Sequence, residues 1–135
     1  MTRFLKLCLA PAAITLTLAA CTNWRLNSAP NPGQASAETG MHVWRDKGCY
    51  GCHGFGKQYG GPDLAGIMDR RDHDWLRKWL KDTRTMLEGD PQAIAMMKDW
   101  KGARMPNMKL SDQQIDALFA YFAQETARVR GGGAE

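Results

Sequence analysis

The amino-acid sequence predicts an all-α fold, a small bundle of four helices joined by glycine-rich loops. From Glu38 onward, apolar residues recur at helical spacing and no segment shows the alternation of a β-strand. Residues that commonly cap helices stand before the apolar runs. These helices contain few aliphatic residues for a core, so we expect an additional apolar group to fill the centre.

The first predicted helix spans residues 38–48 and ends at Gly48, because glycine commonly follows the last turn of a helix. A glycine-rich loop follows as far as Gly61. The second predicted helix spans residues 73–87, with apolar residues at helical spacing and Asp72 as its N-cap.

The third predicted helix begins at Pro91, directly after the capping residue Asp90, since proline is favoured at the first helical position. Its apolar face includes Ile94, Met97 and Trp100. Pro106 then interrupts the helical pattern, because proline disfavours helical backbone in the residue before it.

The last predicted helix opens at a capping box formed by Ser111 and Gln114, two side chains that satisfy the free backbone donors of a helix start. We therefore place the folded domain at residues 38–128. Residues 129–135, rich in glycine, are expected to form a frayed tail.

The charge balance does not favour nucleic-acid binding. The chain of 135 residues contains 18 Lys and Arg and 14 Asp and Glu, a formal net charge of +4. Without the N-terminal Arg3 and Lys6, 16 basic and 14 acidic residues remain, or +2. Nucleic-acid-binding domains usually show a clustered excess of Lys and Arg.

Residues 1–20 are predicted to be a secretory signal peptide, with a short basic start and an apolar run too short for a typical membrane-spanning helix. The signal ends in Leu-Ala-Ala-Cys, which resembles the lipobox of bacterial lipoproteins. This resemblance implies that Cys21 is lipidated and anchors the chain to the periplasmic face of a bacterial membrane. The alternative is an ordinary cleaved signal with a chance cysteine.

Residues 21–37 are rich in Asn, Ser, Ala, Pro and Gly and show no apolar period, so we expect a flexible tether after the lipid anchor. Thr22, not an aspartate, follows Cys21. By analogy with lipoproteins, nothing here specifies the inner rather than the outer membrane.

The segment Cys49-Tyr50-Gly51-Cys52-His53 is the attachment signature of c-type haem. Two thiols at this spacing reach the vinyl groups on one edge of a porphyrin, and the imidazole of the next residue points at the iron. A thioredoxin-like redox pair would need a βαβ setting. A zinc site would need more ligands than the remaining His42 and His73 offer. We therefore predict one covalently bound haem c.

The second iron ligand is predicted to be Met105, because it lies in an irregular segment held by Pro106 just before the last helix. Met108 in the same segment is the alternative. The other methionines are interpreted as core residues, since methionine fills irregular gaps. Ligation by His53 and Met105 raises the reduction potential and leaves no open coordination site.

Over residues 38–128 the chain resembles bacterial class I cytochromes c, on the segments CYGCH, GPDL, MP and LSDQQIDALFAYF together with Gly40 and Trp44. The resemblance implies a cytochrome c-like helical bundle wrapped around one haem. It implies that Gly40 allows the first and last helices to cross closely, with Trp44 against the last helix.

The same resemblance assigns roles at the site. It implies that the Pro62 carbonyl accepts the Nδ1 proton of His53, that Leu64 contacts the haem and that Met105 is the distal ligand. More narrowly, the chain is similar to small cytochromes that accompany denitrification enzymes. The stretch from Asp82 to Ala103 is longer than in the smallest relatives and is expected to cover a haem edge or to shape a docking face.

Basic residues concentrate in one segment, namely Arg70, Arg71, Arg77, Lys78, Lys81 and Arg84. Our preferred interpretation is a solvated helix face with internal pairs such as Asp74–Lys78, and the alternative is an electrostatic docking patch. Arg71 or Trp75 is a candidate donor to a haem propionate.

These observations predict an electron carrier rather than an enzyme, because no activated nucleophile or pair of catalytic carboxylates is evident. The expected partners are a protein electron donor and acceptor, with a denitrification reductase as one candidate, and no small-molecule substrate. The alternatives are a haem subunit of an oxidase or reductase complex and a gas-binding haem sensor.

Overall fold

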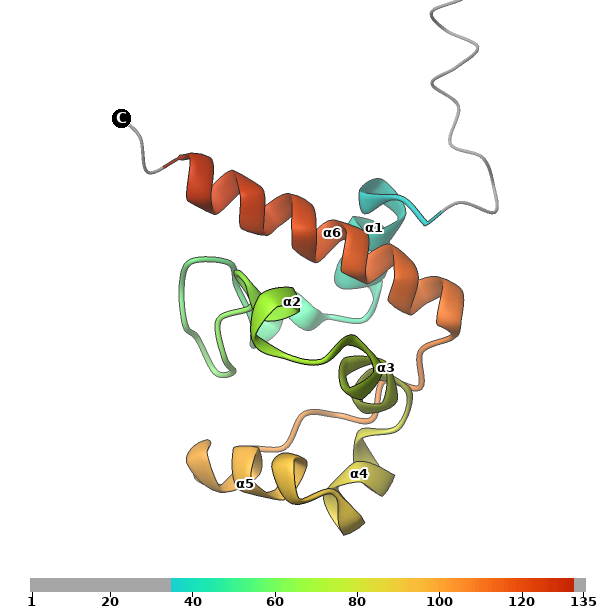
Figure 1. The fold of residues 1–135 in the computed structure, drawn as a ribbon, viewed down its shortest axis with the longest axis vertical. Coiled ribbons are helices and arrows are strands. Elements are labelled where there is room, and N and C mark those ends of the chain that lie inside the picture. The colour runs from blue at the N-terminus through green and yellow to red at the C-terminus, as the bar shows by residue number, and fades with distance from the viewer. Residues whose placement is uncertain (1–34, 133–135) are drawn as a thin grey trace, which may run out of the picture. The chain divides into compact units, whose positions relative to one another are not determined.

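The computed structural model describes residues 35–132, and within them it contains α-helices, one short 3₁₀ helix and no strand, as Figure 1 shows. The predicted all-α fold is confirmed. The predicted signal peptide, Cys21 and most of the tether lie outside the described residues. The elements are α1 (Ala37–Asp46), η1 (Cys49–Gly51), α2 (Ile67–Arg70), α3 (His73–Lys81), α4 (Thr83–Gly89), α5 (Pro91–Asp99) and α6 (Asp112–Gly131).

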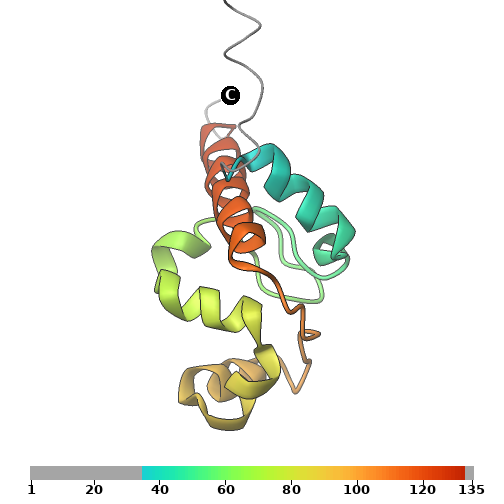
Figure 2. The same cartoon turned by 90° about the vertical axis from the view of Figure 1, so that its right-hand side faces the viewer.

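Helices α1 and α6 cross at one end of the domain, and α4 and α5 lie at the other (Figures 1 and 2). At the crossing, Gly40 is buried against the backbone of Ala117, and a Cβ there would overlap the Ala117 carbonyl oxygen. The Trp44 ring lies 5.9 Å from that of Tyr121 and 6.0 Å from that of Phe122. The close crossing and the aromatic contact implied by the resemblance are therefore both present.

The prediction of one helix over residues 73–87 is wrong, because the chain breaks at Asp82 between α3 and α4. Asp82 has φ −152° and ψ 80°, outside the helical region. Its carboxylate accepts hydrogen bonds from the backbone N and Oγ1 of Thr85 and from Nδ2 of Asn107. Because these bonds stabilise a non-helical backbone at Asp82, they end α3. The same side chain caps the start of α4, as an N-cap does.

The last helix continues to Gly131, so the predicted frayed tail does not begin at residue 129. Arg130 pairs with Asp69 at 2.7 Å, and the Val129 side chain lies against Gly56. These tertiary contacts extend the helix beyond the end predicted from glycine content alone. No helix within residues 35–132 combines the length and apolarity needed to span a bilayer.

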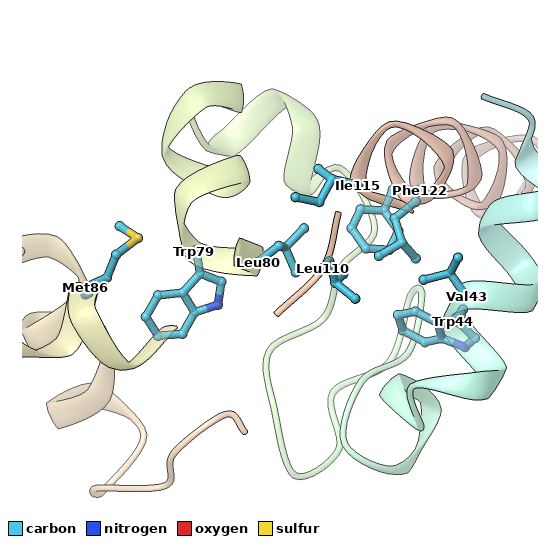
Figure 3. Close-up of a cluster of buried hydrophobic side chains, with 10 residues drawn as sticks. Val43, Trp44, Trp79, Leu80, Met86, Leu110, Ile115 and Phe122 are labelled. Carbon is cyan, nitrogen blue, oxygen red and sulfur yellow. The ribbon is translucent and has the colours of Figure 1, made fainter. Parts of the chain in front are cut away.

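A continuous group of buried apolar side chains joins the two ends of the domain (Figure 3). In that view Leu80 and Leu110 lie between Trp79 on one side and Trp44 and Phe122 on the other. Ile115 and Leu118 of α6 are completely buried. The α4–α5 segment joins this group through Met86 and Ala93.

Ion pairs between α3 and α6 replace the expected pairs along α3. Arg77 binds Asp112 at 3.2 Å and also Asp116, and Lys81 binds Asp112 at 2.8 Å. The expected pair Asp74–Lys78 is not among the ion pairs of residues 35–132. The basic residues of α3 therefore contact acids on the first turns of α6, because the two helices lie side by side.

Replacement of Gly40 by alanine should destabilise the domain by about 3 kcal/mol, the upper range for overpacking a close contact. The added Cβ would overlap the Ala117 carbonyl oxygen and lie 2.7 Å from Cβ of Tyr121, so α1 and α6 must separate. Urea unfolding measures the change. The control Gly89→Ala places its Cβ more than 4 Å from other atoms and should change stability by less than about 1 kcal/mol. Equal effects of both changes would contradict the close crossing.

Replacement of Asp112 by asparagine should destabilise the domain more at neutral pH than in acid. The hydrogen bond from Lys81 lowers the pKa of Asp112 below its ordinary 3.8, and Arg77 adds to the effect. A lowered folded pKa contributes stability above the ordinary pKa, and this is lost as the pH falls through the folded value. Urea unfolding of both proteins at neutral pH and at about pH 3 tests this. Asp99→Asn, an exposed acid without an ion pair in residues 35–132, is the control. A constant stability difference at both pH values would contradict the prediction.

Candidate haem pocket

A cavity of about 270 Å³ lies between α1, α3, α5, α6 and the loops that join them. Its wall is mainly apolar and includes Trp44, Trp79, Leu80, Leu87, Met96, Leu118 and Phe122. All six residues predicted for the site contribute to this wall, namely Cys49, Cys52, His53, Pro62, Leu64 and Met105. Met108, the alternative ligand, also lines it.

The two cysteines and His53 occupy a single tight turn that follows α1. Gly48 has φ 68°, a left-handed conformation that glycine adopts without strain, and it turns the chain from α1 into η1. The backbone N–H groups of Cys52 and His53 then both donate to the carbonyl of Cys49, at 3.2 and 3.0 Å. This turn brings two free thiols and an imidazole to one cavity wall.

The two thiols differ in environment. Cys49 is half-buried and Cys52 is exposed. Burial raises the pKa of the Cys49 thiol, so Cys49 is protonated at neutral pH. Within residues 35–132 no group of three or more His, Cys, Asp or Glu could hold a metal ion, so the two thiols fit thioether formation better than a zinc site.

The imidazole of His53 is oriented by the loop that follows it. Its Nδ1 lies 2.9 Å from the carbonyl oxygen of Pro62. A carbonyl only accepts hydrogen bonds, so Nδ1 holds the proton and Nε2 keeps a free lone pair for a metal. This is the contact that the resemblance implied for Pro62.

Gly61 is a residue of the site that the sequence analysis missed. A Cβ at Gly61 would lie 2.6 Å from Cε1 and 2.9 Å from Nδ1 of the His53 ring. Its backbone N–H also donates to the carbonyl of Cys52 at 2.7 Å. The glycine therefore gives the imidazole its space, and the doublet Gly60-Gly61 just before Pro62 was the available signal.

Leu64 is placed in the cavity wall by a second set of loop contacts. Its backbone N–H donates to the carbonyl of Gly54 at 2.9 Å. The carboxylate of Asp63 accepts from the backbone N–H groups of Gly56 and Ala65, both at 2.9 Å. These bonds close the loop on itself and leave the Leu64 side chain toward the cavity.

The segment that contains Met105 is fixed at several points. Nε1 of Trp79 donates to the Met105 sulfur at 3.2 Å, and Nδ2 of Asn107 donates to Asp82 at 2.8 Å. The backbone N–H of Leu110 donates to the carbonyl of Leu80 at 3.3 Å. Within residues 35–132, no hydrogen bond to the Met108 sulfur is present. Sequence reasoning missed Trp79 and Asn107, because both appeared to be ordinary core or loop residues.

The two other histidines do not line the cavity. Nε2 of His73 lies 3.1 Å from the carbonyl of Met68, and its ring contacts Phe119. Both candidate propionate donors, Arg71 and Trp75, line the cavity, but Trp75 already donates its Nε1–H to Asp90 at 3.2 Å.

The donor set fits haem c. An apolar wall suits a porphyrin, two thiols suit its vinyl groups, and an imidazole with a free Nε2 and a thioether suit its iron. A positive side chain, Arg71, is present at the wall for a propionate.

The comparisons with known proteins agree with this chemistry. The family model described as cytochrome c matches residues 37–125. A solved cytochrome c domain from Pseudomonas putida is 36% identical and has a TM-score of 0.62, with 71% of this chain and 95% of that chain covered. None of the curated proteins compared matches the chain.

A solved cytochrome c from Rhodothermus marinus is 21% identical with a TM-score of 0.62, covers 74% of this chain and 87% of its own, and supports the fold. The predicted cytochrome c-like helical bundle is therefore confirmed. The chain belongs to the cytochrome c family, and it binds haem c covalently and transfers electrons through the haem iron.

Proposed function

We propose that the chain is a membrane-anchored monohaem electron carrier on the periplasmic side of a bacterial membrane. In this proposal Cys49 and Cys52 form the thioethers, and His53 and Met105 are the axial ligands. The observation that best supports it is that an imidazole with a free Nε2 and a hydrogen-bonded thioether line the same apolar cavity.

The haem supplies a one-electron Fe(III)/Fe(II) couple. The chain's own residues hold the iron in one coordination state while the charge changes. The Pro62 carbonyl accepts the Nδ1 proton of His53 and so fixes the orientation of the ring. The apolar wall limits access of water, and with His53 and Met105 both engaged no position remains for a substrate. These features favour electron transfer over catalysis or gas sensing.

The propionate contact is assigned to Arg71. Trp75 was the other candidate, but its Nε1–H is directed to Asp90. The guanidinium of Arg71 lies over the Trp75 ring, 5.9 Å from its centroid, and it also lines the cavity. A guanidinium held in this way is suited to pair with a carboxylate at the haem edge.

The anchoring and location are proposed from residues 1–37. The apolar segment that ends at Cys21 favours export and lipidation, and the tether that follows would allow the domain to reorient near the membrane. The electron donor and acceptor are redox proteins of the same compartment. The similarity to cytochromes of denitrification favours a denitrification reductase as one partner.

A haem subunit of an oxidase or reductase complex is the second candidate. The Pseudomonas putida relative is a cytochrome c domain of a protein, so the fold is also used as a module. Purification from native membranes distinguishes the two functions, because a subunit remains bound to its complex whereas a carrier does not.

The ligand assignment predicts how the reduced protein responds to carbon monoxide. The wild-type protein should not bind CO rapidly at neutral pH, because Met105 occupies the sixth position. Met105→Ala should bind CO rapidly and completely, and its oxidised form should lose the weak red absorption band of a methionine–Fe(III) bond. Stopped-flow and absorption spectroscopy measure both.

Met108→Ala is the matched control and should behave as the wild type does. If Met108→Ala, and not Met105→Ala, opens the site, the ligand assignment is wrong. Rapid and complete CO binding by the wild-type protein would instead favour a sensor or an enzyme.

The anchoring proposal predicts that Cys21→Ser moves the chain from the membrane fraction to the soluble fraction of a host that processes lipoproteins. Loss of the acyl chains removes the burial of methylene groups that holds the protein to the bilayer. Mass spectrometry of the wild-type chain should show a lipidated residue 21 at its start. Cys8→Ser, within the signal, is the control and should leave the chain in the membrane. Retention of Cys21→Ser in the membrane would overturn the proposal.

A further inference from the structure

We propose that Trp79 is a positioning residue for the distal iron ligand, and that its indole N–H selects the Met105 sulfur over that of Met108 and raises the reduction potential. This inference rests on the proposed function, in which Met105 is the ligand. It adds a residue that neither the attachment signature nor the sequence resemblance assigned.

The contact itself is well defined. Nε1 of Trp79 lies 3.2 Å from Sδ of Met105, 26 positions apart in the chain. The Trp79 side chain is buried, and both residues line the cavity. A buried indole N–H without an acceptor would be costly, so this donor holds the sulfur at one place.

The Trp79 ring is itself held in a fixed plane. It stacks on the Trp75 ring with centroids 5.6 Å apart and an interplanar angle of 8°. Trp75 in turn donates to Asp90, the N-cap of α5, at 3.2 Å. One turn further along, Oγ1 of the buried Thr83 donates to the Trp79 carbonyl at 2.9 Å. The position of the Trp79 indole is therefore fixed, and the Met105 sulfur can accept its hydrogen bond only where the indole N–H points.

The bond is compatible with iron ligation, because a thioether sulfur has two lone pairs. One binds the iron and the other accepts the indole N–H. Both Met105 and Met108 line the cavity, but within the described residues only the Met105 sulfur has this donor. The donor therefore distinguishes two otherwise similar thioethers.

The sign of the effect on the potential follows from the direction of polarisation. An N–H that points at sulfur withdraws electron density and weakens its donation to iron. Fe(III) depends more on that donation than Fe(II) does, so the hydrogen bond favours the reduced state. Hydrogen bonds to ligand atoms and burial are general means by which proteins adjust haem potentials.

The experiment compares the reduction potentials of three holoproteins with that of the wild type. Trp79→Phe removes the N–H and part of the ring. Incorporation of 3-benzothienylalanine at position 79 replaces the N–H by sulfur and keeps the size and stacking of the ring. Incorporation of 3-benzothienylalanine at position 75, the matched control, makes the same replacement in the other ring of the stack, whose N–H goes to Asp90, and keeps the ring on which Trp79 stacks.

We expect both changes at position 79 to lower the equilibrium constant for reduction about threefold, or about 28 mV at 59 mV per tenfold for one electron. The methionine–Fe(III) absorption band should also move in both. The same replacement at position 75 should leave the potential and the band near the wild-type values, because it keeps the stacked ring. The protein with 3-benzothienylalanine at position 79 preserves packing, so it remains informative if Trp79→Phe fails to accumulate.

Two results would overturn the inference. One is an unchanged potential with 3-benzothienylalanine at position 79, and the other is an equal fall with the same residue at position 75, which would indicate a general effect of packing. Failure of the proposed ligand set has a different signature, because Met105→Ala would then keep the methionine band. If Met105→Ala loses the band while position 79 has no effect, only the role of Trp79 is excluded.

Discussion

The crossing of α1 and α6 determines where the haem-binding residues lie. Gly40 allows the two helices to approach within a distance that no side chain would permit, and Trp44 then lies against Tyr121 and Phe122. Helix α1 ends at Asp46, and η1 begins three residues later at Cys49. The direction of α1 therefore fixes the start of the attachment segment, while α6 supplies Leu118 and Phe122 to the cavity wall behind it.

The two sides of the cavity depend on contacts between residues at different separations in the sequence. The side with His53 is built from bonds within one loop, such as His53 to Pro62 and Gly61 to Cys52, which are nine residues apart in each case. The side with Met105 depends on Trp79 and Asp82, which are 26 and 25 positions from their partners. A short motif can specify the first side by itself. The second exists only after α3 and the methionine segment have come together.

This difference explains what the sequence could predict. The caps at Asp72, Asp90 and Ser111 were predicted correctly, because each side chain bonds to backbone three residues away. The turn that carries the two cysteines and His53 likewise depends on hydrogen bonds between residues close in the sequence. The break at Asp82 was missed because the apolar spacing continues through it. Its cause is partly distant: Asn107 donates to the Asp82 carboxylate, and a pattern of residues does not show which distant donor arrives.

The ion pairs between α3 and α6 and the role of Trp79 were missed for the same reason. Lys81 was interpreted as part of a solvated helix face and Asp112 was not considered, because the sequence does not show that the two helices lie side by side. Trp79 satisfied the helical period, so it was counted as core, and it is indeed buried. Burial alone does not reveal that its N–H points at a sulfur. The direction of a polar atom inside an apolar side chain depends on the tertiary structure.

Asp82 also connects the inserted α4–α5 segment to the iron ligand. It caps α4 through Thr85 and holds Asn107, two residues after Met105. At the other end of α4, Asp90 caps α5 and fixes Trp75, which stacks on Trp79. The segment is thus attached to the Met105 region at two points, one on each side of α4. It therefore acts as part of the haem site: a shift of α4 moves both the backbone near the methionine and the donor on its sulfur, and the two contacts restrain the ligand together.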